Sequence, residues 1–260
     1  MPEVEAAGET IHYLRAGSGA RSMVLVHGFG SDARSWTMNQ PALAASATVY
    51  AIDLPGHGAS PARDISGLDR MAWVLAEAIA ALTPGPVHLV GHSMGGAIAL
   101  RLAELFPARL RALTLIAPAG VGTGRNLDFI PRFLAMEDET TAEAALRPLV
   151  ANPALLNRQI VGGVLAARRQ PHIHEAWQAM RRIGGEIWAR PAEARPALAT
   201  LAMPVQIIWG ERDAVLPPEG LDDLPPNVRL HLLPGLGHVP HMEGMRQTNQ
   251  LIAAFDTTEG

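Results

Sequence analysis

The chain has 260 residues, of which 48% are hydrophobic, and a formal net charge of −4. A chain of this length can bury a full hydrophobic core. Because it has a net negative charge and no basic cluster, it lacks the electrostatic footprint of a protein that binds nucleic acid or an anionic membrane surface. We therefore expect one core and neither nucleic acid nor membrane as a partner, with the oligomeric state left open.

Two residue types are missing, and their absence excludes several kinds of chemistry. The sequence has no cysteine, which rules out disulfides, thiolate metal sites and a cysteine nucleophile. All 21 basic residues are arginine, so no lysine is available for a Schiff base, a Walker-type phosphate loop or a lipoyl-lysine arm. The first residues resemble no export signal and no stretch is apolar enough to span a bilayer, so we expect a cytoplasmic protein.

Short apolar runs alternate with helical patterns through the first half of the chain. Such alternation is typical of βαβ units, in which a mostly parallel sheet has helices on both faces. The predicted strands cover residues 10–15, 22–26, 48–52, 87–90 and 113–116, and the predicted helices cover 35–45, 68–82 and 94–106.

The alternation stops after residue 120. Residues 126–188 show helical patterns without a convincing strand, and strand patterns return at 205–209 and 228–232. We therefore predict an α/β core formed by residues 1–120 and 190–260, with a helical cap at 121–189 inserted late in the sheet. For most of the large apolar residues of the cap, we favour a role in packing within the cap over one in lining a pocket. These residues are Phe129, Phe133, Met136, Trp177, Met180 and Trp188.

A serine framed by glycines follows the predicted strand at 87–90. The stretch Gly91-His92-Ser93-Met94-Gly95 has the spacing G-x-S-x-G, which places a serine hydroxyl on a sharp turn between a strand and a helix. The helix that follows directs free N–H groups toward any negative charge that develops near Ser93. The alternative is a glycine-rich turn without chemistry, and the rest of the chain has to decide between the two.

A serine nucleophile needs a base to accept its proton and an acid to orient that base. Asp213 follows the predicted strand at 205–209, and His238 follows the strand at 228–232. The order Ser93, Asp213, His238 is the order of nucleophile, acid and base that this sheet topology supplies. We therefore predict these three residues as a catalytic triad.

Three neighbours compete for the same roles. Glu211 is the rival acid and His241 is the rival base, because each lies close to the favoured residue in sequence. His92 directly precedes Ser93 and is expected to point away from it.

Four motifs together resemble those of the α/β-hydrolases, and the match covers nearly the whole chain. They are residues 27–30 (His-Gly-Phe-Gly), 91–95, 209–217 and 237–243. The resemblance implies the α/β-hydrolase fold and an oxyanion hole formed by the backbone N–H groups of Phe29 and Met94. It also implies a mainly structural role for residues 53–58, so His57 is not a candidate catalytic residue.

A narrower resemblance is to the hydrolase-like domain of acyltransferase components in acetoin dehydrogenase complexes. It rests on residues 51–60 (AIDLPGHGAS) and 115–120 (LIAPAG), within a similar stretch from His27 to about Val161. Those components pass an acyl group through a lipoyl-lysine. Because this chain has no lysine, we do not expect it to act as such a component by itself.

The leading functional interpretation is a carboxylic-ester hydrolase for a small or medium acyl substrate, needing neither metal nor cofactor. A serine at position 93 argues against the haloalkane dehalogenase and epoxide hydrolase branches, since resemblance to them would require aspartate there. One alternative is a hydrolase of carbon–carbon bonds in diketones or ring-cleavage products. Another is a non-catalytic hydrolase fold that binds a ligand, but such proteins usually lack a triad residue.

Four polar residues of the predicted cap are interpreted without a catalytic role. Arg181 and Arg182 could bind an acidic substrate, although a solvated helix face is favoured. His172 and His174 have no carboxylate or thiolate ligands at a useful spacing, so they are expected to be surface residues rather than a metal pair.

Overall fold

The core of the protein is one mostly parallel sheet of eight strands. In this computed structural model, residues 1–189 and 197–257 are described, apart from the side chains at positions 182, 188, 189, 256 and 257. The strand order is β1-β2-β4-β3-β5-β6-β7-β8, with β1 and β2 antiparallel and the others parallel. The strands are β1 (Glu3–Ala6), β2 (Glu9–Ala16), β3 (Arg21–Val26), β4 (Ala47–Ile52), β5 (Val87–His92), β6 (Leu110–Ile116), β7 (Val205–Gly210) and β8 (Val228–Leu233).

The predicted α/β fold with a parallel sheet is confirmed. Strands β4, β5 and β7 are buried at every position, because helices cover both faces of the sheet. Their carboxyl ends lie at one edge, where parallel-sheet proteins place their ligand sites. Strand β1 was not predicted: it is a short edge strand in which only Ala6 is buried, so its sequence lacks the apolar run used to find the others.

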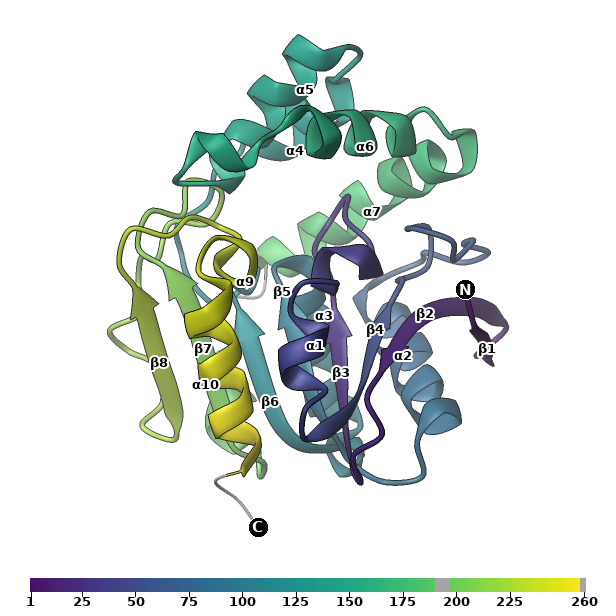
Figure 1. The fold of residues 1–260 in the computed structure, drawn as a ribbon, viewed down its shortest axis with the longest axis vertical. Helices are drawn as coiled ribbons and strands as arrows, with labels where there is room; N and C mark the ends of the chain where they lie inside the picture. Colours follow the sequence, from purple (N-terminus) through teal and green to yellow (C-terminus); the bar gives the residue numbers. More distant parts are fainter. Residues whose placement is uncertain (190–196, 258–260) are drawn as a thin grey trace.

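Helices pack on both faces of the sheet (Figure 1). Helices α2 (Leu68–Leu82) and α3 (Met94–Leu105) pack against each other on one face, and α1 (Gln40–Leu43) lies beside α10 (Met245–Thr257) on the other. The helix predicted at 35–45 is divided into a 3₁₀ turn, η1 (Ala33–Trp36), and the short α1. Pro41 explains this division, since proline is tolerated in the first turn of a helix but not in its interior.

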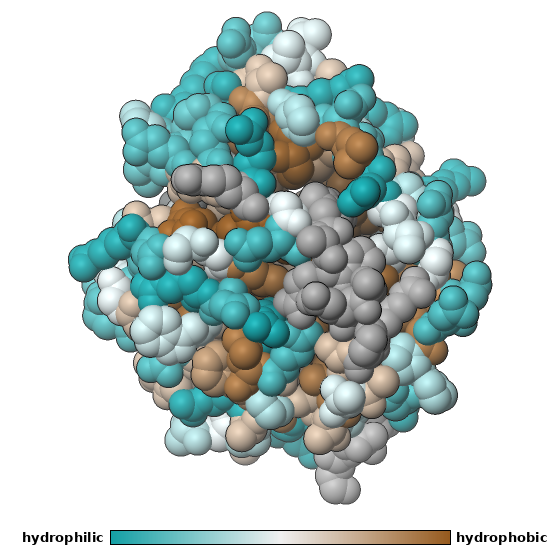
Figure 2. Space-filling view, turned by 180° about the vertical axis from the view of Figure 1, so that it is seen from behind, coloured by the Kyte–Doolittle hydropathy of each residue, from teal (hydrophilic) through white to brown (hydrophobic). Residues whose placement is uncertain are grey.

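The helices that follow β6 and precede β7 in the chain cover the carboxyl edge of the sheet (Figure 1). They are α4 (Phe129–Ala135), α5 (Glu139–Leu146), η3 (Arg147–Leu149), η4 (Pro153–Leu155), α6 (Arg158–Arg168) and α7 (Pro171–Ala189). The predicted division into a core and a cap at residues 121–189 stays a prediction. Figure 2 shows hydrophilic residues over much of the outer surface of these helices and hydrophobic residues where they meet the sheet portion.

The remaining short elements are η2 (Pro107–Arg109) after α3 and α9 (Pro240–Glu243) before α10. Within the described ranges, no helix has the length and apolar character needed to cross a membrane.

Candidate active site

Ser93 lies at the junction of β5 and α3 in a strained backbone conformation. Its φ is 52° and its ψ is −116°, a left-handed geometry that is uncommon for a residue with a side chain. The Ser93 N–H donates a hydrogen bond to the Ile116 carbonyl at 2.9 Å, which ties the turn to the neighbouring strand. A Cβ at Gly91 would lie 2.5 Å from the Gly95 carbonyl oxygen, and a Cβ at Gly95 would press into the His27 carbonyl. The two flanking glycines are therefore required by the tightness of this turn.

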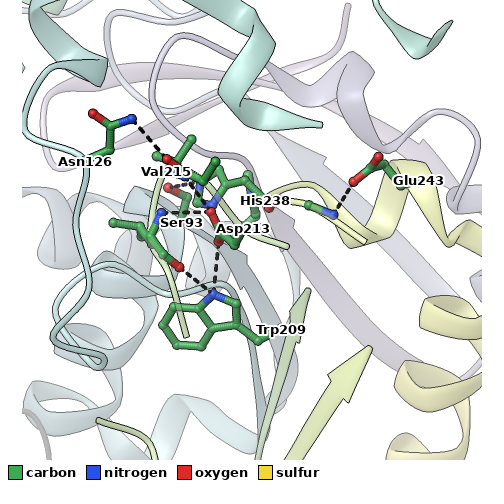
Figure 3. A network of polar contacts seen from close by, with 11 residues as sticks. Ser93, Asn126, Trp209, Asp213, Val215, His238 and Glu243 are labelled. Carbon is green, nitrogen blue, oxygen red and sulfur yellow. Dashed lines mark hydrogen bonds and ion pairs between the residues drawn. The ribbon is translucent and has the colours of Figure 1, made fainter. Parts of the chain in front are cut away.

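The predicted base and acid lie in line with the serine (Figure 3). The Nε2 atom of His238 is 2.9 Å from Ser93 Oγ, and its Nδ1 atom is 2.7 Å from Asp213 Oδ2. The His238 side chain is 2% exposed, and the Asp213 side chain is fully buried. The structure thus brings together all three residues that the sequence predicts as a triad, although they come from three different loops.

Asp213 is held by groups that bind both of its carboxylate oxygens. The N–H groups of Val215 and Leu216 each donate to Oδ1 at 2.8 Å, and the indole N–H of Trp209 donates to Oδ2 at 3.0 Å (Figure 3). These three donors compensate the buried negative charge of the Asp213 carboxylate. They also fix the orientation in which Oδ2 faces His238.

The rival residues occupy other positions. Glu211 is exposed at the end of β7. The Nε2 atom of His92 is 2.9 Å from the His238 carbonyl oxygen, so His92 supports the backbone of the histidine loop and makes no described hydrogen bond to Ser93. The His241 ring packs 4.4 Å from the Trp36 ring and 4.6 Å from the His92 ring. Burial lowers the pKa of His241 to about 3, with a smaller contribution from His238, so its ring is neutral at ordinary pH.

A second carboxylate fastens the histidine loop to the helices above it. Glu243 accepts hydrogen bonds from the N–H groups of Ala151 and Asn152, each at 2.9 Å, and from the Gly237 N–H (Figure 3). The His238 N–H donates to the Leu149 carbonyl at 2.9 Å. The loop that carries the candidate base is therefore held by Glu243 and the Leu149 carbonyl as well as by Asp213.

The two predicted oxyanion-hole residues border the same space as Ser93. Phe29 follows β3, Met94 is the first residue of α3, and both line a cavity together with Ser93 and His238. Gly28 packs directly against the nucleophile, since a Cβ on Gly28 would lie 3.1 Å from Ser93 Cβ. The first N–H groups of α3 have no partner within the helix, as in any helix.

The cavity above Ser93 has a volume of about 950 Å³ and a mostly apolar lining. Of the large apolar residues that the sequence assigns to the predicted cap, Phe129, Phe133 and Met180 line this cavity. Met136 and Trp177 are instead buried in the packing, at 0% and 1% exposure. The side chain of Trp188 lies outside the described part of the chain.

The polar residues predicted to be solvated lie on α7. Arg181 is exposed, as expected, but it also lines the cavity, whereas the side chain of Arg182 is outside the described part. His172 is exposed and His174 is half-buried. Among the described residues, no group of three or more His, Asp or Glu is arranged to hold a metal ion.

A cluster of buried polar residues lies beside the loop that carries Phe29, and it was not predicted from the sequence. It contains His27, His57 and Asp53, all at most 1% exposed. Asp53 accepts from the N–H groups of Ala33 at 2.7 Å and Ala59 at 2.9 Å, linking the loop after β3 to the loop after β4. The sequence does show polar residues in the glycine-containing loops that follow these two strands. The hydrogen bonds between the two loops cannot be read from it.

Comparison with known proteins identifies the family of the chain. A model of the alpha/beta hydrolase family matches residues 23–251. The chain belongs to this family.

Relatives within the alpha/beta hydrolase family carry several activities. The chain is 34% identical over 256 residues to a dihydrolipoyllysine-residue acetyltransferase component of the acetoin cleaving system from Pseudomonas putida, with 97% of this chain and 68% of that protein covered. It is 29% identical over 252 residues to a pimeloyl-[acyl-carrier protein] methyl ester esterase from Methylococcus capsulatus, covering 90% of this chain and 93% of the relative.

Among solved structures, the fold is similar to that of a meta-cleavage product hydrolase from Pseudomonas fluorescens IP01. The TM-score is 0.89 with 22% sequence identity, and 100% of this chain and 98% of that chain are covered. At this identity the likeness shows a shared alpha/beta hydrolase fold. The family membership and the esterase and hydrolase relatives show that this protein is a hydrolase-family enzyme.

Proposed function

We propose that this enzyme is a serine hydrolase that cleaves a carboxylic ester, or a related acyl bond, of a small to medium substrate. The observation that carries the proposal is the 2.9 Å contact between Ser93 Oγ and His238 Nε2. Its support is the 2.7 Å contact from His238 Nδ1 to Asp213. The base His238 is therefore within hydrogen-bond reach of both the nucleophile and the orienting acid.

In the first half of the proposed reaction, Ser93 Oγ attacks the acyl carbon and its proton passes to His238 Nε2. The tetrahedral intermediate then collapses as the bond from carbon to the leaving oxygen breaks. His238 returns the proton to the leaving alcohol, and an ester between Ser93 and the acyl group remains. Asp213 keeps the Nδ1–H tautomer of His238 in place and stabilises the positive ring that forms in between.

In the second half, water takes the place of the alcohol. His238 accepts a proton from the water as its oxygen attacks the acyl carbon, and the collapse of the second tetrahedral intermediate returns that proton to Ser93 Oγ. The products are a carboxylic acid and the regenerated enzyme. In both halves we assign the backbone N–H groups of Phe29 and Met94 to the oxyanion, a type of interaction that contributes on the order of 100-fold or more per donor.

The substrate class is proposed from the cavity. Its apolar lining and volume of about 950 Å³ favour a largely apolar acyl group over a sugar or a nucleotide. The relative from Methylococcus capsulatus is named as a methyl ester esterase, which supports ester cleavage.

A second candidate is the hydrolysis of a carbon–carbon bond in a diketone or ring-cleavage product. Arg181 favours it, because this cavity-lining arginine has no carboxylate among its described contacts and could bind an acidic substrate. One solved structure of similar fold is that of a meta-cleavage product hydrolase. The two candidates use the same triad and differ in the bond that breaks.

A substrate panel tests both candidates. Purified wild type and Ser93→Ala are assayed side by side on nitrophenyl esters of two to twelve carbons, a thioester, a lactone and a dienoate ketone. The proposal expects ester turnover by the wild type and a loss of at least about 10³-fold in Ser93→Ala. Turnover of the dienoate alone selects the second candidate. Equal ester turnover by both proteins rejects Ser93 as the nucleophile.

A fluorophosphonate probe separates either enzyme from a non-catalytic ligand-binding fold. The probe reacts only with an activated serine, so we expect labelling of the wild type at Ser93 and none in Ser93→Ala. Failure to label folded wild-type protein would support the non-catalytic alternative.

A further inference from the structure

Two buried histidines outside the triad lie on adjacent loops at the carboxyl edge of the sheet. His27 directly follows β3, and His57 lies in the loop after β4; they are 0% and 1% exposed. Their ring centroids are 4.9 Å apart. Neither ring has a role in the proposed proton transfers, so their burial needs another explanation.

The hydrogen bonds of His27 define its tautomer. The Leu54 N–H lies 3.1 Å from His27 Nε2, and since an N–H can only donate, Nε2 is the acceptor. The ring proton is therefore on Nδ1, which donates to the Gly28 carbonyl oxygen at 2.8 Å. His27 thus fixes the carbonyl of the peptide that joins Gly28 to Phe29, and the Ser31 N–H donates a longer hydrogen bond to the same oxygen at 3.3 Å.

The same peptide contains the Phe29 N–H. In a planar trans peptide the C=O and N–H bonds point in opposite directions. Fixing the Gly28 oxygen on His27 therefore directs the Phe29 N–H to the opposite side, and Gly28 is the residue that packs against Ser93.

His57 fixes the next peptide in the same way. The Gly30 N–H donates to His57 Nε2 at 3.2 Å, so this ring also has its proton on Nδ1, which faces the Pro55 carbonyl at 3.3 Å. The Gly30 N–H belongs to the peptide that joins Phe29 to Gly30. The peptides on both sides of the Phe29 Cα atom are consequently held by histidine ring nitrogens.

We infer that His27 and His57 are positioning residues for oxyanion stabilisation, because together they fix the two peptides that flank Phe29. This inference rests on the proposed function, in which the Phe29 N–H binds the oxyanion. It assigns a role in the reaction to two residues that do not touch the substrate. Their contribution is to hold the donor in place before the charge develops, so that no reorganisation is needed during the reaction.

The electrostatics of the cluster keep both rings neutral, as these bonds require. Burial and, to a smaller extent, His27 lower the pKa of His57 to about 3, against opposing contributions from the Pro55 carbonyl and Asp32. Burial also lowers the pKa of His27, against opposing contributions from the Gly28 carbonyl, Asp53 and Asp32. A proton on either Nε2 atom would face a backbone N–H and remove its acceptor.

The test compares leucine and glutamine at each position. Leucine removes the ring nitrogens, whereas the glutamine amide retains one donor and one acceptor on a side chain of similar length. For His27→Leu and His57→Leu we expect kcat on a nitrophenyl ester to fall by about 10- to 100-fold while KM changes by less than about threefold. One oxyanion donor contributes on the order of 100-fold or more, and a donor that is still present but less well oriented loses part of that. The glutamine variants should recover a large part of the lost kcat.

A transition-state analogue provides the second readout. A boronic acid forms a tetrahedral adduct with Ser93 and places an oxygen in the oxyanion position. Its affinity should fall in parallel with kcat in the leucine variants. His88→Leu is the matched control, because His88 is also buried, at 0% exposure, but its Nε2 contacts Thr114 Oγ1 at 2.7 Å between β5 and β6. That variant should lose stability and keep its kcat and boronate affinity.

The inference is overturned if both leucine variants fold and retain wild-type kcat and boronate affinity, or if His88→Leu shows the same losses. If the leucine variants do not fold, histidine-labelled wild-type protein is measured by long-range ¹H–¹⁵N correlation at pH 7. Neutral Nδ1–H tautomers at His27 and His57 support the inference, and any other state of either ring contradicts it. Ser93→Ala in the same assays distinguishes failure of this inference from failure of the proposed function. If Ser93→Ala is inactive while the leucine variants keep full activity, only this inference fails. An active Ser93→Ala would reject both.

Discussion

At the scale of single residues, the site depends on atoms that are held before any substrate arrives. Ser93 adopts a positive φ of 52°, a conformation that costs on the order of 1–3 kcal/mol and persists because surrounding contacts fix it. The strand, the helix and the two flanking glycines supply those contacts. The position of the half-buried Ser93 hydroxyl at the cavity is thus a consequence of how β5 meets α3.

The hydrogen bonds of Asp213 make one substitution especially informative. In Asp213→Asn, the N–H groups of Val215 and Leu216 would keep the amide oxygen at the Oδ1 position, so the amide NH₂ would face His238. A donor there favours the wrong tautomer of His238, with its proton on Nε2. We expect kcat to fall by about 10³- to 10⁴-fold, as in triads of this type.

Steady-state kinetics on a nitrophenyl ester measure this effect, and circular dichroism checks the fold. Glu211→Gln is the matched control, because Glu211 is the rival acid and is exposed. It should keep nearly full activity. A large loss in Glu211→Gln with little loss in Asp213→Asn would reverse the assignment of the acid.

At the scale of secondary-structure elements, the helices between β6 and β7 determine what reaches Ser93. Helix α6 carries two adjacent glycines, Gly162 and Gly163, and a Cβ at either position would meet nothing within 4 Å. Gly163 lines the cavity, whereas Gly162 is not among its lining residues. A glycine inside a helix costs roughly 1 kcal/mol relative to alanine, so space in the cavity is a physical reason for glycine at position 163.

Because Gly163 lines the cavity and Gly162 does not, a larger side chain at position 163 should change the preference of the enzyme for the length of the acyl chain. Gly163→Leu should reduce kcat/KM for twelve-carbon esters relative to four-carbon esters by about tenfold, because the new side chain occupies part of the cavity while a lost CH₂ contact is worth about 0.8 kcal/mol. Gly162→Leu should leave the ratio unchanged. Assays of kcat/KM across an ester series measure the shift, and equal ratios in both variants would contradict an acyl site beside α6.

The sequence predicted elements well where burial is continuous. Strands β3, β4, β5 and β7 are apolar runs that end in loops with glycine or proline, and α2 was predicted with the bounds that the structure has. It failed for β1, which is short and mostly exposed, and for the helix that Pro41 confines to α1. The first error arises because β1 offers no apolar run, and the second because Pro41 restricts the helix despite the helical periodicity around it.

The candidate site shows the same division. Ser93, Asp213 and His238 were predicted because each follows a strand and the order of the three is informative. The bonds of His27 and His57 join loops 27 residues apart in sequence, and no local pattern reports such pairings. The cavity-lining position of Arg181 likewise depends on how α7 is oriented over the sheet.

At the scale of the whole molecule, several buried histidines make stability depend on pH. Burial lowers the pKa of His57 and His241 to about 3, against about 6.5 in the unfolded chain. Above pH 6.5 these rings are neutral in both states and contribute nothing. Between pH 6.5 and 3 the unfolded chain binds protons that the folded protein does not, so the free energy of unfolding falls as the pH falls.

The size of this effect is measurable by urea unfolding. Each ring lowers the free energy of unfolding by roughly 1 kcal/mol per pH unit below 6.5, so a loss on the order of 2–3 kcal/mol is expected from pH 7.5 to 5.5. His57→Gln, which lacks one titrating ring, should show a smaller loss over the same range. A free energy of unfolding that stays constant or rises toward pH 5.5 would contradict the neutral state of these rings.

The most direct test of the central claim is to trap the acyl-enzyme. Wild-type protein is mixed with a nitrophenyl ester, quenched in acid within the first turnovers, and analysed by intact mass and by mass spectrometry of the peptide that contains Ser93. We predict a mass increase equal to the acyl group, located on Ser93 and absent in Ser93→Ala. Ester turnover by the wild type with no adduct on Ser93, or with an adduct on another residue, would contradict the account.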